Sequence, residues 1–392
     1  MRIGILTFHD QLNYGGVLQA FALREKAAEL SKSSVEMIHL WHDPRDATLL
    51  GKEYNPNVPI FSQWRNRLKA KKRPHGRVEF ANRRKKTKEL IYSKLNLSKE
   101  VYRTARDLKK LPLYDTVIFG SDQVWNPFFE PPTGAPEKNA YLGTFLPETQ
   151  KRVAYAASFG VSDLPSEMYK PYQRQLEKFS YVTIREASGA TLFQKIMGGE
   201  KPDVVLDPTL LLSPEQWRSI VSTRPRPTKP YLLSYWLGSP SKERLDWLEA
   251  LSDCMGIPIV LLVARPQKID LEIPGKIMPC YDADPFDFVA LIEGCEGIVT
   301  DSFHGMIFAT LFEKKGAFIL PSDPANASGP SRFTDFLKRY EINDAIYDAE
   351  KFIAGEIPVE SLKLAPLKVN QEIFQADRTR SLMHLEQMLL NV

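Results

Sequence analysis

The run VTDSFHGMIFATLF at 299–312 gathers side chains that can transfer protons and bind anions at one turn of the chain. A short apolar run typical of a buried strand ends here, and a segment of small and apolar residues typical of a helix follows. The turn between them consists of Asp301, Ser302, Phe303 and His304, and Gly305 begins the helix. A helix N-terminus attracts anions, and a histidine donates a proton near neutral pH. His304 is therefore a candidate catalytic residue, although Asp301 or Ser302 capping the helix beside a structural His304 is an equal alternative.

A second cluster follows a predicted strand in YDTVIFGSDQVWNP at 114–127. Ser121, Asp122 and Gln123 come directly after this strand, and Trp125 lies two residues further on. Polar groups beside an aromatic ring suit a site for a sugar, and Asp122 is a candidate general base. The alternative makes Asp122 a turn residue and Trp125 a core residue, and for Trp125 we favour the core.

Two further loops follow predicted strands. TIREASG at 183–189 places Arg185 directly after a strand, where a guanidinium can bind phosphate or carboxylate or can simply pair with Glu186. In HDQLNYGGVLQA at 9–20, the residues Asn13, Tyr14, Gly15 and Gly16 form a polar turn at the start of a helix. This turn has the spacing of neither a dinucleotide fingerprint nor a P-loop.

No metal or cofactor site is predicted from the sequence. The six histidines show no paired spacing of the kind that holds zinc. The run Asp282-Ala283-Asp284 resembles a metal-binding acid pair, but it precedes Pro285 and a helical segment. Helix capping therefore explains it better.

Strand-like and helical runs alternate along the chain, which predicts an α/β fold with parallel sheets. Three prolines in TRPRPTKP at 223–230 favour a linker. We therefore expect two Rossmann-like domains with a cleft between them. The predicted parts are an N-terminal domain at 1–222, the linker, a C-terminal domain at 231–365 and a C-terminal helix at 366–392.

The composition of the 392 residues is that of an ordinary globular protein. Cys254, Cys280 and Cys295 form neither a disulfide framework nor a close-spaced metal set, which suits a reducing compartment. No signal segment opens the chain, and no apolar run has the length of a membrane span. We therefore expect a cytoplasmic location.

The stretch 65–88 holds twelve Lys and Arg residues and one acid, although the net charge of the chain is only +4. The simplest interpretation is a solvated helix face. A peripheral contact with anionic lipid at the inner membrane face, or with a lipid-linked sugar, is the second interpretation. Aromatic residues are sparse in this stretch, so nucleic acid is not an expected partner.

An ordered set of motifs resembles the polysaccharide pyruvyltransferase family. The set comprises ILTFHDQLNYGGVLQAFAL, YDTVIFGSDQVWNP, YAASFG, IREASG, VLDPTLLL, TDSFHGMIFATLF and SRFTDFLKRYEI. These motifs follow the order of the family across most of the chain, whereas residues 45–110 and the C-terminal helix match it poorly.

The resemblance implies a fold similar to the GT-B class of glycosyltransferases, with phosphoenolpyruvate as donor substrate and a glycan hydroxyl pair as acceptor. By resemblance, the donor would bind in the C-terminal half and the acceptor in the N-terminal half. The donor-binding residues would be Arg185, Ser302, Phe303, His304 and Gly305. The residues near the acceptor would be Asn13, Tyr14, Gly15, Ser121, Gln123 and Trp125.

The resemblance leaves open which sugar is the acceptor and whether that acceptor is lipid-linked, nucleotide-linked or polymeric. His304 is the first candidate for the acid or phosphate partner, and Asp122 or Asp301 for the base. The alternatives are a glycosyltransferase that uses a sugar nucleotide, and a non-catalytic carbohydrate-binding protein with the same fold.

Overall fold

A computed structural model describes most of the chain. The described residues are 1–10, 12–40, 75–102, 105–127, 139–238, 240–267, 270–320, 329–342, 345–353, 356–362 and 364–390. Residues 65–74, the first part of the basic stretch, lie outside the described residues.

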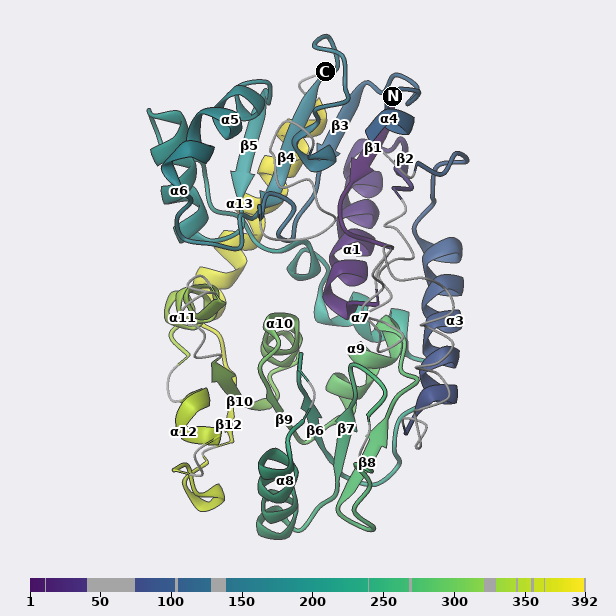
Figure 1. Ribbon diagram of the computed structural model, residues 1–392, viewed down its shortest axis with the longest axis vertical. Coiled ribbons are helices and arrows are strands. Elements are labelled where there is room, and N and C mark those ends of the chain that lie inside the picture. The colour runs from purple at the N-terminus through teal and green to yellow at the C-terminus, as the bar shows by residue number, and fades with distance from the viewer. Residues whose placement is uncertain are drawn as a thin grey trace, which may run out of the picture.

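The first sheet has five parallel strands in the order β2-β1-β3-β4-β5 (Figure 1). Its strands are β1 (Arg2–Leu6), β2 (Ser34–Met37), β3 (Thr116–Phe119), β4 (Arg152–Ala157) and β5 (Tyr181–Ile184). The central strands β3 and β4 are buried along their whole length, as expected of strands that helices cover on both faces. The helices of this part are α1 (Tyr14–Ser31), α3 (Arg77–Lys94), α4 (Ala105–Leu108), α5 (Ser166–Leu176) and α6 (Ala187–Met197), with the short η3 (Ala140–Leu142) and η4 (Pro208–Leu210).

The second sheet has the order β11-β10-β9-β6-β7-β8, with β12 antiparallel to β10 and every other pair parallel. Its strands are β6 (Leu232–Tyr235), β7 (Ile259–Leu262), β8 (Ile277–Cys280), β9 (Gly297–Thr300), β10 (Lys315–Leu320), β11 (Ile346–Asp348) and β12 (Ala365–Pro366). Its helices are α8 (Lys242–Met255), α9 (Pro285–Gly294), α10 (Phe303–Leu311), α11 (Gly329–Arg339), α12 (Ala349–Ile353) and η6 (Val359–Ser361). The fold is therefore α/β with two Rossmann-like domains, GT-B-like, as predicted.

The connection between the domains runs through α7 (Pro214–Val221) and the proline-rich residues 223–230, and β6 begins at Leu232. The apolar run DVVL predicts a strand at 203–206, and this prediction is wrong: only Val204 forms a bridge, to Ile184. Asp207 and Pro208 begin η4 immediately afterwards, so this run ends before a strand can pair.

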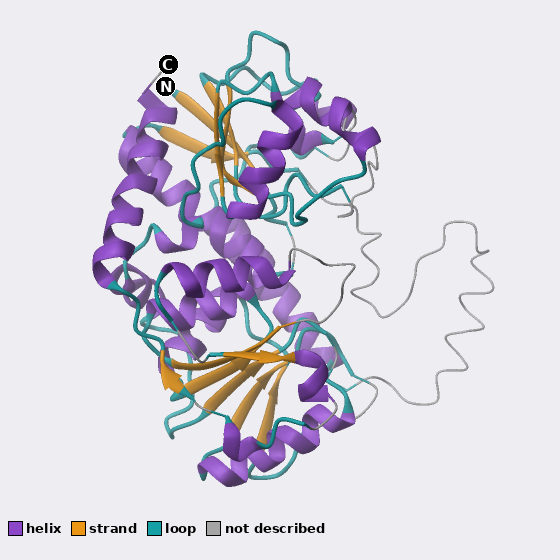
Figure 2. Ribbon diagram, turned by 90° about the vertical axis from the view of Figure 1, so that its left-hand side faces the viewer, coloured by secondary structure: helices purple, strands orange, loops and turns teal. Residues whose placement is uncertain are grey.

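The last helix, α13 (Gln371–Leu390), leaves the second sheet and packs against the first domain, as Figures 1 and 2 show. The Leu206 N–H donates to Ser381 Oγ at 3.0 Å, and Lys151 Nζ donates to the Met388 carbonyl at 3.2 Å. The C-terminal helix therefore fastens the end of the chain to the N-terminal domain.

The helix α3 joins the two domains from the side. Arg83 is buried and donates from Nη2 to the Leu12 carbonyl at 2.7 Å and from Nη1 to the Val263 carbonyl at 3.1 Å. Lys86 Nζ donates to Asp282 Oδ2 at 2.9 Å. Part of the basic stretch is therefore used to hold the domains together.

Candidate functional site

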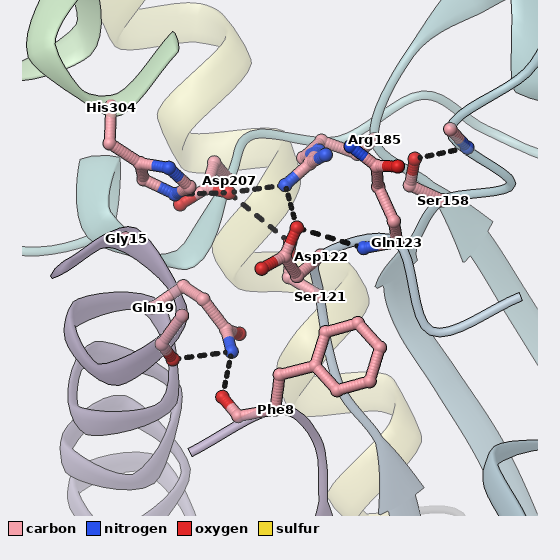
Figure 3. Close-up of polar contacts among 12 residues, drawn as sticks. Phe8, Gly15, Gln19, Ser121, Asp122, Gln123, Ser158, Arg185, Asp207 and His304 are labelled. Carbon is pink, nitrogen blue, oxygen red and sulfur yellow. Dashed lines mark hydrogen bonds and ion pairs between the residues drawn. The ribbon is translucent and has the colours of Figure 1, made fainter. Parts of the chain in front are cut away.

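The carboxyl ends of strands from both sheets meet in one polar cluster (Figure 3). Ser121 and Asp122 follow β3, Arg185 follows β5, and His304 comes from α10, which follows β9 of the other sheet. In parallel α/β sheets this edge is where ligands bind. The structure therefore brings together side chains that are far apart in the sequence.

The backbone fixes Asp122 in an unusual conformation. Its φ is 70°, in the left-handed region that few non-glycine residues adopt. Its carbonyl accepts the Ser158 N–H at 3.1 Å, and its own Oδ1 accepts the Gln123 N–H at 2.9 Å. These bonds hold the carboxylate at the strand end, and strained positions of this kind are frequent at functional sites.

Arg185 lies in a nest of carboxylates. Its Nη1 is 3.2 Å from Asp207 Oδ2 and 3.6 Å from Asp122 Oδ1, and its Nε is 3.4 Å from Glu186 Oε2. Burial alone would lower the pKa of Arg185, but Glu186, Asp122 and Asp207 together raise it. The guanidinium is therefore held charged, and its buried Nη2 has no hydrogen-bond partner among the described residues.

Asp207 links the two halves of the cluster. Its Oδ1 accepts the Thr209 N–H and hydroxyl at 3.0 and 2.8 Å, and its Oδ2 accepts the Ser121 hydroxyl at 3.2 Å. His304 Nε2 lies 3.6 Å from the same Oδ2, a distance that suits an ion pair better than a hydrogen bond. Burial favours a higher pKa for Asp207, but His304 and then Arg185 hold this pKa well below its ordinary value.

The start of α1 supports the ring of His304 from below. Asn13 caps α1 by accepting the Gly15 N–H at 3.0 Å, and a Cβ atom placed on Gly15 would lie 2.0 Å from His304 Nδ1. Ser302 caps α10 by accepting the Gly305 N–H at 3.2 Å. The two helix starts therefore meet at His304, and only glycine at position 15 leaves room for the imidazole.

A second arginine completes a cationic group around Phe303. The guanidinium carbons of Arg185 and Arg332 lie 5.2 and 5.3 Å from the centre of the Phe303 ring, and the His304 ring is centred 5.7 Å away. Burial, and then the charge of Arg185, lowers the pKa of Arg332 to about 10. The buried Nε of Arg332 and Nε2 of His304 have no hydrogen-bond partner in the part of the chain that the structure describes.

Three predicted residues take other positions. Tyr14 is buried between the domains, stacked on Phe288 of α9 at 4.6 Å under the guanidinium of Arg83 at 4.2 Å. Trp125 is buried in the core of the first domain and donates to the Tyr141 carbonyl at 3.1 Å, the alternative that the sequence favoured.

The third residue is Asp301. Its Oδ1 accepts the Leu237 N–H at 2.8 Å, and burial raises the pKa of its carboxyl to about 6. This contact directs it toward the loop after β6 rather than toward Arg185.

Gln123 lies at the edge of the cluster, where its Oε1 accepts the Asn126 amide at 2.7 Å. Nearby, the Ser158 hydroxyl donates to Glu186 Oε1 at 2.6 Å. Sequence reasoning missed Asp207 and Arg332 as site residues. Asp207 lies in the motif VLDPTLLL and Arg332 in SRFTDFLKRYEI, so both motifs pointed to these residues. Both residues reach the site only through long-range packing, which the local sequence does not show.

Among the described residues, no group of three His, Cys, Asp or Glu side chains is placed to hold a metal ion. Asp284 caps α9 by accepting the Phe286 and Asp287 N–H groups at 2.8 and 2.9 Å. No helix within the described ranges is long and apolar enough to cross a membrane.

The fold is similar to several solved structures at low sequence identity. The protein UGT89C1 of Arabidopsis thaliana is 11% identical with a TM-score of 0.48, covering 100% of this chain and 98% of that one. The UDP-GlcNAc 2-epimerase of Methanocaldococcus jannaschii is 14% identical with a TM-score of 0.42, covering 96% and 99%. The E. coli heptosyltransferase WaaC is 12% identical with a TM-score of 0.40, covering 96% and 100%. These identities are too low to transfer a substrate or a reaction.

No curated protein matches the chain. A family model does: polysaccharide pyruvyl transferase matches residues 13–323, which include α1 with Gly15, Arg185, Asp207 and His304. The chain therefore belongs to the polysaccharide pyruvyl transferase family.

Proposed function

We propose that this chain transfers the pyruvyl group of phosphoenolpyruvate to two hydroxyl groups of a glycan sugar, forming a cyclic ketal and releasing phosphate. The observation that carries the donor assignment is the set of buried donor atoms around Phe303. Arg185 Nη2, Arg332 Nε and His304 Nε2 all lack a hydrogen-bond partner within the described residues. A buried unpaired donor costs about 1–3 kcal/mol, so Arg185 Nη2 and Arg332 Nε, with the imidazole of His304 beside them, favour a bound anion with several acceptor oxygens.

Phosphoenolpyruvate has the matching chemistry because it carries a phosphate and a carboxylate. Arginine binds both groups through paired N–H donors, and the free N–H groups at the start of α10 favour negative charge. Arg185 and Arg332 would bind the two anionic ends, and His304 would lie beside the phosphate. No metal or cofactor is required by this scheme.

The reaction needs a proton at the methylene carbon of the donor and a base at the acceptor hydroxyl. In our proposal His304, held beside Asp207, supplies the proton, and Asp122 accepts one from the first attacking hydroxyl. Acid and base catalysis of this kind each contribute about 10²–10⁴-fold to a rate. The phosphate leaves with its P–O bonds intact, and a second hydroxyl closes the ketal ring at the same carbon.

The donor assignment is tested by titrating phosphoenolpyruvate and a nucleoside diphosphate into the protein by calorimetry. We expect phosphoenolpyruvate to bind, and the Arg185→Gln variant to weaken that binding at least about tenfold, about 1.4 kcal/mol. If the protein binds the nucleoside diphosphate but not phosphoenolpyruvate, the result would instead favour a sugar-nucleotide glycosyltransferase.

We also propose a peripheral contact between the basic stretch 65–88 and an anionic membrane, which would bring a lipid-linked acceptor to a cytoplasmic enzyme. Within the described part of this stretch, Arg77, Lys85 and Lys88 are exposed on α3, and Tyr92 lies further along the same helix at 64% exposed. Each basic residue near an anionic surface contributes about 1 kcal/mol.

Replacing Arg77, Lys85 and Lys88 with glutamine should therefore weaken binding to phosphatidylserine vesicles about 100-fold in a sedimentation assay. Neither the wild type nor the variant should bind neutral vesicles. Unchanged sedimentation would assign α3 to domain contacts and a solvated face alone.

A further inference from the structure

A second carboxylate, that of Asp10, lies in the loop after β1, at the same edge of the sheet as Asp122. Asp10 follows β1 and His39 follows β2, and β1 lies between β2 and β3 in the sheet. His39 Nε2 is 3.9 Å from Asp10 Oδ2, and the ring of His39 is centred 5.8 Å from the ring of His9. Because β1 pairs with β3, the loop that holds Asp10 lies next to the loop after β3 that holds Asp122.

Tyr141 packs close to the loop that holds Asp10. Its ring packs against Phe8 at 4.8 Å between centres, and Phe8 lies two residues before Asp10. Burial raises the pKa of Tyr141, and the charges of Asp10 and Asp122 raise it further, so both carboxylates lie within electrostatic range of this phenol. Asp122 in turn lies 3.6 Å from Arg185, which connects the pair to the donor end of the site.

Exposure distinguishes these two carboxylates from Glu186 and Asp207. The side chains of Asp10 and Asp122 are each 12% exposed, whereas those of Glu186 and Asp207 are 7% and 1% exposed. Both carboxylate oxygens of Asp207 also already accept hydrogen bonds, from Thr209, Ser121 and Arg185. Asp10 and Asp122 are therefore the carboxylates of this cluster that an entering hydroxyl can reach.

The proposed ketal reaction has a use for two bases. One molecule of phosphoenolpyruvate and one diol give one ketal and one phosphate, so two hydroxyl protons are removed. One proton ends on the carbon that becomes the methyl group, and the other ends on the phosphate. Two C–O bonds form at the central carbon of the donor, and its bond to the phosphate oxygen breaks.

We infer that Asp10, held by His39, is the base for the second hydroxyl, the one that closes the ketal ring. This inference rests on the proposed pyruvyl transfer and extends it to a residue that is not in the donor site. In this arrangement one hydroxyl of the acceptor sugar lies at Asp122 and its partner lies at Asp10. The acceptor is therefore a sugar whose two reacting hydroxyl groups can face two separate carboxylates.

The test is the ratio of phosphate released to ketal formed, in the wild type and in Asp10→Asn. The wild type should give a ratio of one. In Asp10→Asn the first hydroxyl still attacks and phosphate still leaves, but ring closure is slow. Water then adds to the central carbon and the adduct breaks down to pyruvate and free acceptor. We expect ketal formation to fall at least about 100-fold while pyruvate accounts for the excess phosphate, with the KM for phosphoenolpyruvate unchanged within about twofold.

Two variants whose side chains are of equal size control for a folding defect. Asp10→Glu keeps a carboxylate and Asp10→Gln removes it, so the Glu variant should form ketal at least about tenfold faster than the Gln variant. Asp163→Asn, an exposed carboxylate of the same domain, serves as the control and should match the wild type.

Equal ketal rates in the Glu and Gln variants, or a ratio of one in Asp10→Asn, would overturn the role of Asp10 and leave pyruvyl transfer standing. A wild type that forms no ketal with any acceptor would instead refute the proposed function, and the role of Asp10 with it.

Discussion

Replacing Gly15 with alanine tests whether the start of α1 positions His304. The added Cβ atom would lie 2.0 Å from Nδ1 and 2.4 Å from Cγ of the imidazole, closer than any real contact, so the ring or the helix must move. Gly16, the next residue, offers a matched control. Its Cβ atom would lie 3.6 Å from the Phe8 carbonyl oxygen and 3.7 Å from Asp122 Oδ2, which are ordinary contacts.

The two substitutions should change the free energy of unfolding in different directions. Alanine favours a helix over glycine by up to about 1 kcal/mol, so Gly16→Ala should be neutral or slightly stabilising. The same gain at Gly15 is opposed by overpacking, which costs about 1–3 kcal/mol. We therefore expect Gly15→Ala to lower the free energy of unfolding by up to about 2 kcal/mol.

The functional effect should be larger than the effect on stability, because a displaced His304 leaves Asp207 and the donor site. We expect kcat/KM for phosphoenolpyruvate to fall at least about 100-fold in Gly15→Ala and to change less than threefold in Gly16→Ala. Urea unfolding and phosphate release, measured on both variants, separate the two effects. Equal activities in the two variants would refute the role of α1 in positioning His304.

Three further predictions concern single residues. Burial raises the pKa of Asp301 to about 6 in the folded protein, so ionisation of this carboxyl opposes folding. The free energy of unfolding should therefore fall by on the order of 3 kcal/mol as the pH rises from about 4, near the pKa of an unfolded aspartate, through 6. Urea unfolding should therefore show that the stability of Asp301→Asn rises relative to that of the wild type between pH 4.5 and 7.5. A stability difference independent of pH would contradict this. Arg332→Gln should weaken phosphoenolpyruvate binding at least about tenfold by calorimetry, and unchanged binding would remove Arg332 from the donor site. Arg83→Met leaves the Leu12 and Val263 carbonyls without their donor and should cost about 3 kcal/mol in urea unfolding, whereas a loss below about 1 kcal/mol would show that α3 is not needed to hold the domains.

Much of the fold could be predicted from local sequence. Polar turns bound the apolar runs at 115–120, 152–157, 231–237 and 297–300, which predict four strands. The strands β3, β4, β6 and β9 each end within two residues of these ranges. Parallel sheets follow from the alternation of strands and helices, since each strand needs a helix to return the chain. The short β8, β11 and β12 were not predicted, because few of their residues are apolar and their pairing depends on neighbours.

The candidate site could be predicted only in part. Arg185, Asp122 and His304 follow strands, and the carboxyl edge of a parallel sheet is where such residues meet. Asp207 precedes Pro208 in what resembled a strand end, and nothing local shows that it faces Arg185. Tyr14 has a polar neighbourhood in the sequence, yet it packs between the domains because α1 meets α9 there.

The central claim is tested most directly by following both products of one reaction. Purified protein is incubated with phosphoenolpyruvate and a panel of free and lipid-linked glycans, and phosphate release is measured alongside proton NMR of the acceptor. We predict acceptor-dependent phosphate release and a new methyl singlet from the pyruvate ketal, both lost in His304→Gln with the fold intact. Phosphate release without that methyl signal, or transfer of a sugar from a nucleotide donor by the same protein, would contradict pyruvyl transfer.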